Sequence, residues 1–363
     1  MKGLFNSVFS GRRVLITGDT GFKGSWLSVW LREMGADVYG YALPPKTGRD
    51  NFVRTGLGGK INHCDGDVVD YDSFFAYAKK VNPEIAFHLA AQTLVIHSYE
   101  NPRTTYETNL MGTVNFFETV RNLPGLKVAI NVTSDKCYEN KDWVWGYREN
   151  DAMGGKDPYS SSKGCSELIT AAYTHSFFSG KGQLVASGRA GNVIGAGDWA
   201  ENRIVPDFFR ACLDKKELVI RNPDHTRPWQ HVLEPLSGYL QLAAKLYAGE
   251  KDFSGGWNFG PLDSNHHSVL DLVQSLIGVF GKGAYQVPQS EKKFHEAHLL
   301  KLDISKSMKL LEWSPVLNFR ETVEFTVKGY EHELEPGNIY DQRVNQIISY
   351  TEAARSKGIQ WAS

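Results

Sequence analysis

The stretch Val14-Leu15-Ile16-Thr17-Gly18-Asp19-Thr20-Gly21-Phe22-Lys23-Gly24 decides the fold of this chain of 363 residues. Three β-forming residues precede glycines spaced three apart, and apolar residues at helical spacing follow, at Trp26, Leu27, Trp30, Leu31 and Met34. The pattern predicts a strand, a tight turn and a helix. Gly18 permits the turn, Gly21 lets the backbone approach a ligand closely, and Gly24 lets the helix pack against the strand.

The N–H groups that begin such a helix bind phosphate oxygens. The motif therefore predicts a dinucleotide site, with contacts from Gly18, Thr20, Gly21, Phe22, Lys23 and Gly24. A turn with several glycines also occurs in α/β proteins that bind no nucleotide. The surrounding sequence must therefore decide between a dinucleotide site and a turn without a ligand.

Strands and helices alternate after this motif at the spacing of βαβ units. Strands are expected at 36–42, 61–68, 85–92, 128–133 and 184–187, and helices at 71–80, 102–121 and 158–178. This order predicts an α/β fold, a Rossmann-type doubly wound parallel sheet over residues 1–190 to which some later segments return. Residues 191–363 alternate less regularly, and we expect them to form mainly a smaller, interleaved substrate-binding lobe.

Ligands of such sheets bind at the carboxyl ends of the strands. The predicted cofactor contacts there are Asp67 and Val68 after the third strand and Leu89, Ala90 and Ala91 in the fourth. Asp67 suits an adenine amino group or the N-cap of the next helix. Tyr41 occupies the position where an acid usually binds the ribose of NAD, so the preference for NAD over NADP stays open.

Composition excludes several functions. Lys plus Arg (40) nearly balance Asp plus Glu (41), which argues against a nucleic-acid surface. The four cysteines have no paired spacing, so neither a metal site nor a disulfide framework is predicted. No run of about 18 apolar residues is present, and we expect a soluble, cytoplasmic protein without a membrane partner.

Tyr159 and Lys163 lie four residues apart at the start of the helix predicted over 158–178, and hence on one face. A phenol has a pKa near 10 and needs a nearby cation to act as a base at neutral pH. Lys163 supplies that charge and is also placed to hold the nicotinamide ribose.

These motifs together resemble the extended short-chain dehydrogenase/reductase superfamily, most of whose members act on nucleotide-sugars. The resemblance includes Asn109 and extends to 189–195 and 227–232. It implies NAD as the cofactor, and it implies Asn192 and Arg227 as substrate-binding residues.

The residues after the fifth strand indicate the subfamily. Sugar-nucleotide 4,6-dehydratases commonly carry Thr-Asp-Glu there, whereas epimerases lack the Asp-Glu pair; this chain has Ser134-Asp135-Lys136. The Asp-Lys pair, with 92–95 and 199–203, is most similar to the branch that acts on CDP-glucose. This likeness implies Ser134, Asp135, Lys136, Tyr159 and Lys163 as catalytic residues, and adds Gln92 and Arg203 to the substrate site.

The implied reaction begins when Tyr159 takes the proton of the sugar 4-hydroxyl while NAD⁺ takes the C4 hydride. Asp135 then donates a proton to the departing C6 hydroxyl. Lys136 either removes the C5 proton, with a lowered pKa, or stays charged and stabilises the enolate.

Two other functions stay open: a nucleotide-sugar epimerase or reductase, and a non-catalytic NAD-binding regulatory protein. The resemblance also implies a homodimer, or a dimer of dimers, formed through the helices that carry Asn109 and Tyr159. The implied pathway is bacterial synthesis of 3,6-dideoxyhexoses for the O-antigen of lipopolysaccharide.

Overall fold

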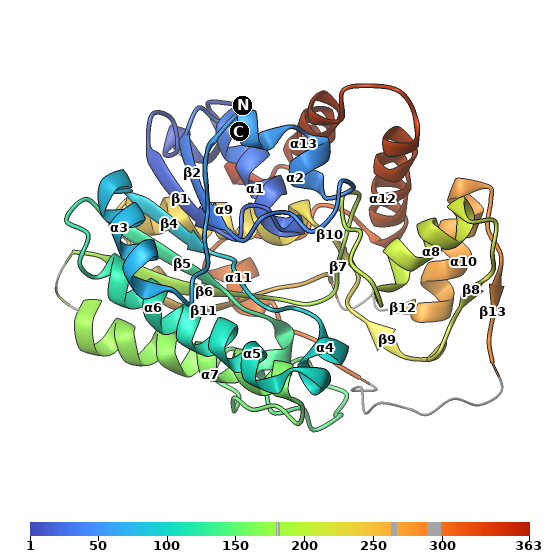
Figure 1. The fold of residues 1–363 in the computed structure, drawn as a ribbon, viewed down its shortest axis with the longest axis horizontal. Coiled ribbons are helices and arrows are strands. Elements are labelled where there is room, and N and C mark those ends of the chain that lie inside the picture. The colour runs from blue at the N-terminus through green and yellow to red at the C-terminus, as the bar shows by residue number, and fades with distance from the viewer. Residues whose placement is uncertain (179, 181, 263–266, 289–298) are drawn as a thin grey trace.

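A seven-stranded parallel sheet forms the centre of the computed structural model, which describes residues 1–178, 180, 182–262, 267–288 and 299–363 (Figure 1). The strand order is β11-β6-β5-β4-β1-β2-β3. From β1 the chain adds β2 and β3 on one side, and then β4, β5, β6 and β11 on the other, as in a doubly wound fold. The strands are β1 Arg13–Thr17, β2 Asp37–Ala42, β3 Asn62–Asp65, β4 Ile85–His88, β5 Val128–Val132, β6 Leu184–Ala190 and β11 Gly255–Phe259.

The glycine-rich turn joins β1 to α1 (Phe22–Glu33) as predicted. Gly18 has φ +79°, a conformation that favours glycine. A Cβ at Gly24 would lie 2.1 Å from the carbonyl oxygen of Gly18, so only glycine lets the helix start this close to the strand. The predicted roles of both glycines are confirmed.

Gly24→Ala is expected to lower the free energy of unfolding by about 1–3 kcal/mol, since the new methyl group must displace backbone atoms. Urea unfolding followed by circular dichroism measures the change. Gly48→Ala is the matched control, because no atom lies within 4 Å of a Cβ at Gly48. Equal midpoints for the two variants would contradict the steric argument.

Helices cover both faces of the sheet and bury separate apolar clusters. Trp26, Trp30 and Leu236 belong to the first cluster, and Leu15, Phe74 and Phe116 belong to the second. The first face carries α1, α9 (Leu233–Tyr247) and α13 (Ile339–Ser356); the second carries α3 (Tyr71–Val81), α6 (Gly112–Val120) and α7 (Pro158–Tyr173).

A smaller lobe beyond β6 has its own apolar core, which includes Phe208, Leu272 and Tyr330. It lies at the right of Figure 1. Its helices are α8 (Ile204–Leu213), α10 (Val269–Phe280) and α12 (Phe319–Leu334), and its short strands are β7 Val193–Ile194, β8 Leu218–Val219, β9 Thr226–Arg227, β10 Gln230–His231, β12 His267–Ser268 and β13 Tyr285–Gln286. A domain boundary near residue 190 stays a prediction.

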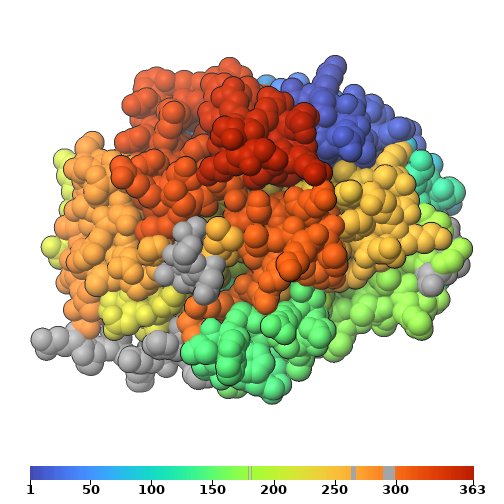
Figure 2. Space-filling model, turned by 180° about the vertical axis from the view of Figure 1, so that it is seen from behind, coloured from blue at the N-terminus to red at the C-terminus, as the bar shows by residue number. Residues whose placement is uncertain are grey.

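The chain ends lie side by side. Seen from behind, the C-terminal residues border the N-terminal segment (Figure 2), and the rings of Phe5 and Trp361 stack with centroids 4.9 Å apart. Four shorter helices complete the described chain: α2 Asn51–Arg54, α4 Val95–Glu100, α5 Pro102–Tyr106 and α11 Ser305–Lys309. None of the described helices is long and apolar enough to cross a bilayer.

Two predicted strands are shorter than expected, since β3 ends at Asp65 and β4 at His88. Residues 66–68 and 89–92 are therefore loop at the carboxyl edge of the sheet. The N-cap alternative for Asp67 is wrong: Asp70 caps α3 by accepting a hydrogen bond from the N–H of Ser73. Asp67 instead accepts one from the N–H of Val69.

Candidate active site

The loops after β1 and β4 meet at the carboxyl edge of the sheet. A Cβ at Gly18 would lie 2.7 Å from the backbone nitrogen of Ala90. Thr17, at the end of β1, joins the two loops through its hydroxyl, which lies 2.7 Å from Nδ1 of His88 and accepts a hydrogen bond from the N–H of Ala90. The glycine turn and 89–91 thus form one surface, as predicted for a cofactor site.

The loop after β5 carries three predicted catalytic residues. The Ser134 hydroxyl donates to Oδ1 of Asp135 at 3.0 Å, and it accepts a hydrogen bond from the N–H of Lys136. Nζ of Lys136 lies 3.5 Å from the same Oδ1. Oδ2 of Asp135 is buried without a hydrogen-bond partner among the described residues. Asp135 as a whole is 1% exposed, so its carboxyl group lies in a site largely shielded from solvent.

Helix α7 begins with Pro158, and Asp157 caps it by accepting a hydrogen bond from the N–H of Ser160. Tyr159 and Lys163 are both buried in the first turns, 8% and 5% exposed. Burial raises the pKa of Tyr159 to about 12, although a hydrogen bond with Ser134 opposes the shift. The groups of the chain alone therefore keep Tyr159 protonated at neutral pH, in contrast to the predicted phenolate.

Glu167 lies one turn beyond Lys163 on α7 and is also buried. It accepts hydrogen bonds from Thr133 and Ser187 and pairs with Arg189 at 2.7 Å. Burial lowers the pKa of Lys163 to about 8, and the charge of Glu167 opposes this shift. Glu167 therefore helps to keep Lys163 protonated.

Arg203 projects into the same region from the residue before α8. It pairs with Asp198 at 2.8 Å and donates to the Thr93 hydroxyl at 3.0 Å. Its charge lowers the pKa of Tyr159. Burial, then repulsion by Lys163 and Arg203, lowers the pKa of Lys23 to about 7. The site is thus rich in cationic groups, as a site for anionic diphosphates requires.

The second half of the chain reaches the site through two adjacent segments. β7 pairs with β10, and the carbonyl of Asn192 accepts a hydrogen bond from the N–H of Gln230. A Cβ at Gly191 would lie 2.7 Å from both Oδ2 of Asp135 and Cγ of Pro228. Asn192 follows Gly191 in the sequence and Arg227 precedes Pro228. Both residues therefore belong to segments that flank the Asp135 loop. Oδ1 of Asn192 is buried without a partner among the described residues.

Gln92 is half-buried, and its polar groups bond within the protein. Its side chain bonds to the backbone of Leu94 and to the hydroxyl of Thr105, while Asn109 binds its backbone N–H and C=O. Gln92 thus shapes the loop after β4, and a direct contact with substrate stays a prediction.

Asp67 is exposed beyond the end of β3, whereas Val68 is buried against α6, where Asn115 binds its carbonyl. Tyr41 is buried between Phe74 and Tyr77, so its ring is not free to meet a ribose.

The residues fit a dinucleotide in two respects. The first turn of α1 has no side-chain cap among the described residues, which leaves its N–H groups for phosphate. The backbone at Gly18 and Gly24 lies too close to its neighbours for any side chain. No group of three or more metal-ligating side chains occurs in the described part of the chain.

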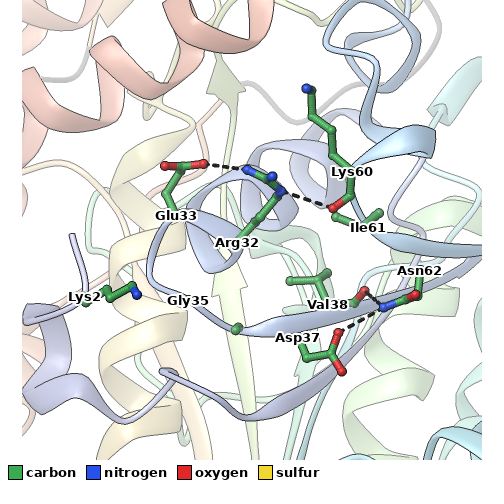
Figure 3. Close-up of a pocket in the computed structure, with 10 residues that line it drawn as sticks. Lys2, Arg32, Glu33, Gly35, Asp37, Val38, Lys60, Ile61 and Asn62 are labelled. Atoms are coloured by element: carbon green, nitrogen blue, oxygen red, sulfur yellow. Dashed lines mark hydrogen bonds and ion pairs between the residues drawn. The ribbon is translucent and has the colours of Figure 1, made fainter.

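A surface cavity of about 410 Å³ lies away from these groups (Figure 3). Arg32, Glu33, Asp37 and Lys60 line it, at the amino ends of β2 and β3. Ligands of parallel sheets bind at the opposite edge, so this cavity is not the candidate site.

Sequence reasoning missed three residues that support the site: Glu167, Asp198 and Thr93. The spacing of four between Lys163 and Glu167 places both on one helix face, so this partner was detectable. The contacts of Arg203 with Asp198 and Thr93 depend on tertiary packing.

Comparison with known proteins gives a consistent result. The family model for GDP-mannose 4,6-dehydratase matches residues 15–326. The CDP-glucose 4,6-dehydratase of Salmonella typhimurium is 48% identical over 350 residues, which cover 95% of this chain and 98% of that protein.

Solved structures have the same fold. The dTDP-glucose 4,6-dehydratase of Bacillus anthracis, in complex with NAD, matches with TM-score 0.73 and 20% identity over 89% of this chain and 97% of that one. The UDP-glucose 4-epimerase of Thermotoga maritima, with UDP-glucose, matches with TM-score 0.76 and 23% identity over 89% and 100%.

Proposed function

Because the chain belongs to the GDP-mannose 4,6-dehydratase family, within the extended short-chain dehydrogenase/reductase superfamily, we propose that it is an NAD-dependent lyase. Its reaction converts CDP-D-glucose to CDP-4-dehydro-6-deoxy-D-glucose and water. The 48% identity with the Salmonella enzyme over nearly the full length of both chains supports the cytidine-linked substrate. A substrate that is a nucleotide-activated sugar suits an enzyme of the cytoplasm, and we include that location in the proposal.

The observation that carries the proposal is the position of Asp135, buried between Ser134 and Lys136 next to Tyr159. A 4-epimerase needs only the Ser134 and Tyr159 pair at the sugar 4-hydroxyl. Removal of water needs an additional acid for the leaving hydroxyl, and Asp135 provides it.

NAD is held, in this proposal, by the 18–24 turn, Asp67 and 89–91, with Tyr159 and Lys163 at the nicotinamide ribose. NAD⁺, when bound, would supply a hydride acceptor for C4 and a hydride donor for C6, so that the overall reaction has no net oxidation. Lys163 would hold the nicotinamide ribose beside the Tyr159 phenol.

The side chains of the protein move the protons. Tyr159 accepts the proton of the 4-hydroxyl, and Ser134 holds the same oxygen. The resulting C4 ketone acidifies the C5–H bond. Asp135 protonates the C6 hydroxyl as it leaves as water. The C5 proton passes to Lys136, or Lys136 stays charged and stabilises the C4 enolate while another group or water takes that proton. Arg203, Asn192 and Arg227 bind the nucleotide-sugar.

Lys136→Ala is expected to retain oxidation at C4 and to lose elimination, because Nζ of Lys136 lies 3.5 Å from the carboxylate of Asp135, the group assigned to elimination. Reduced cofactor, measured by its absorbance, would accumulate on the enzyme while no water is lost from the sugar. Lys216→Ala, at an exposed pair with Asp214, is the control. Product formation like that of wild type by Lys136→Ala would remove Lys136 from the mechanism.

The test of the proposed function is incubation of the purified protein with CDP-glucose and, separately, with UDP-, dTDP- and GDP-glucose. Mass spectrometry measures the loss of one water from the nucleotide-sugar. The same reaction run in D₂O measures exchange of the sugar C5 hydrogen for deuterium. Water loss from CDP-glucose alone is the expected result. A 4-epimerase would give a product of unchanged mass without C5 exchange, and a regulatory protein would give no product.

A homodimer through α7 and the continuous helical segment of η3 (Glu107–Met111) and α6 is part of the proposal. Two large apolar side chains are exposed on these segments, Met111 (45%) and Leu168 (59%). Burial of such side chains favours association. Leu168→Glu is expected to shift the protein toward monomer in light-scattering measurements, whereas Leu310→Glu, exposed elsewhere at 62%, should not. A monomeric wild type would contradict the dimer.

A further inference from the structure

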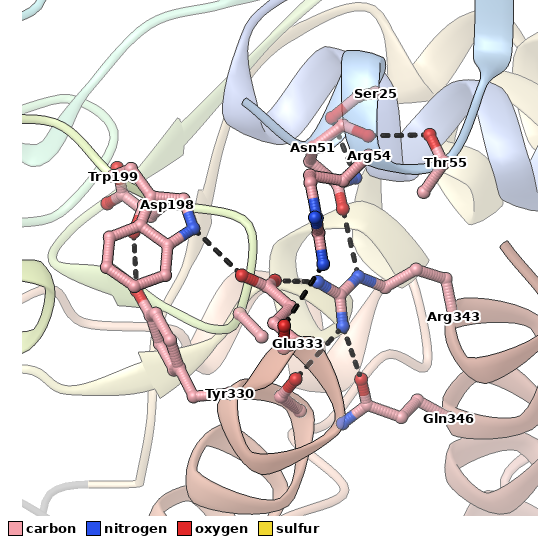
Figure 4. A network of polar contacts seen from close by, with 12 residues as sticks. Ser25, Asn51, Arg54, Thr55, Asp198, Trp199, Tyr330, Glu333, Arg343 and Gln346 are labelled. Atoms are coloured by element: carbon pink, nitrogen blue, oxygen red, sulfur yellow. Dashed lines mark hydrogen bonds and ion pairs between the residues drawn. The ribbon is translucent and has the colours of Figure 1, made fainter. Parts of the chain in front are cut away.

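A buried polar network lies behind the candidate site and connects both C-terminal helices to it (Figure 4). Arg343 of α13 forms an ion pair with Glu333 of α12, and their side chains are 0% and 3% exposed. Arg54 also donates to the backbone carbonyl of Glu333. Replacement of a buried ion pair by apolar residues is often neutral or stabilising, so the pair by itself does not explain the stability of the fold.

One arm of the network reaches the loop before α8. The other carboxylate oxygen of Glu333 accepts the indole N–H of Trp199 at 2.8 Å. Tyr330, one turn earlier on α12, donates to the carbonyl of Asp198 at 2.5 Å. Two side chains of α12 therefore hold consecutive residues of this loop.

The held residues in turn fix Arg203. Asp198 pairs with Arg203 at 2.8 Å, and the other terminal nitrogen of Arg203 donates to Thr93. The guanidinium of Arg203 is thereby directed toward Tyr159 and Lys23, whose pKa values it lowers.

A second arm reaches the dinucleotide turn. Nε of Arg343 donates to Asn51 at 2.9 Å, and the amide of Asn51 donates to the Ser25 hydroxyl at 2.9 Å. Ser25 belongs to the first turn of α1, where its N–H binds the carbonyl of Gly21. The Arg343–Glu333 pair is therefore connected by hydrogen bonds to the first turn of α1, which is part of the predicted cofactor site.

We infer that Glu333, fixed by Arg343, is a positioning residue for Arg203, acting through Trp199 and the loop that it holds. The inference rests on the proposed function, in which Arg203 binds the nucleotide-sugar. Glu333 itself does not touch the reacting groups. Its role is to keep the loop, and thus the guanidinium, in the binding geometry before substrate arrives.

Trp199→Phe is the informative variant, because it removes one hydrogen bond of the network and leaves the Arg343–Glu333 pair in place. We expect a KM for CDP-glucose about tenfold higher with kcat within about twofold of wild type, since a hydrogen bond to a charged group has this magnitude. Trp257→Phe is the matched control, because the indole N–H of Trp257, on β11, likewise donates a single hydrogen bond at 2.8 Å, to the carbonyl of Phe253.

A second measurement needs no substrate. Amide hydrogen exchange of residues 198–204 should be faster in Trp199→Phe than in wild type or Trp257→Phe.

A third measurement combines two substitutions. In an Arg203→Lys background, Trp199→Phe should raise the KM for CDP-glucose no further, because both changes act on one contact.

Unchanged exchange at 198–204, or a KM effect that adds fully to that of Arg203→Lys, would overturn the inference. Wild-type protein that fails to convert CDP-glucose would refute the proposed function instead, and the exchange experiment would still decide the positioning role.

Discussion

Asp135→Asn is expected to slow formation of the dehydrated sugar by about 10²–10⁴-fold, the usual contribution of a general acid. The amide has the shape of the carboxyl group but is a far weaker acid, so the C6 hydroxyl leaves without a proton donor. Oxidation at C4 does not need this proton. A single turnover should therefore show the absorbance of reduced cofactor without loss of water by mass spectrometry.

Asp214→Asn is the control for the same chemical change, because Asp214 lies at an exposed surface pair. Asp135→Asn would disprove the assignment if it released the dehydrated product at the wild-type rate. Loss of the reduced-cofactor signal as well would place Asp135 at the oxidation step.

Tyr159→Phe is expected to block the first step, with a loss of about 10³–10⁴-fold in product formation. Without the phenol oxygen, no group accepts the proton of the 4-hydroxyl, since the Ser134 hydroxyl is a much weaker base. Neither reduced cofactor nor dehydrated sugar should accumulate. The two variants thus differ in one measurement, the absorbance of the reduced cofactor.

Tyr285→Phe, in the smaller lobe, provides the matched control, because its hydroxyl accepts a hydrogen bond from Gln274 away from the candidate site. The role of Tyr159 as the base would be wrong if its Phe variant still reduced the cofactor rapidly. Binding of CDP-glucose, measured by calorimetry, should be retained within about tenfold and shows that the fold is intact.

Most of the sheet was predictable, because buried parallel strands are short apolar runs and helices have a 3.6-residue period. The edge strand β11 was not assigned from sequence. Its residues Gly255-Gly256-Trp257-Asn258-Phe259 lack the β-branched pattern. Gly256 is explained by a residue distant in sequence, since a Cβ there would lie 2.3 Å from Nη2 of Arg189. Such a contact has no signal in local sequence.

The proximity of Tyr159 and Lys163 to 134–136 was predictable, because a spacing of four shares a helix face and both segments lie at the carboxyl edge of the sheet. Their catalytic roles stay predictions. The site was less predictable where tertiary packing determines a role. Gln92 has the polarity of a ligand-binding residue, but its side chain bonds to the backbone of Leu94 and to the hydroxyl of Thr105. The pKa of Tyr159 depends on burial, which a motif does not report. Glu333 and Arg343 lie far from every motif in the sequence.

The position of β11 in the sheet has a consequence for synthesis of the protein. β6 ends at Ala190, but its outer neighbour starts only at Gly255, and the smaller lobe begins between them. At about 5–20 residues per second, a ribosome needs several seconds to make the intervening segment. During that time the edge of β6 presents unpaired backbone groups. The nascent chain is therefore exposed to aggregation at this edge until the last third of the protein emerges.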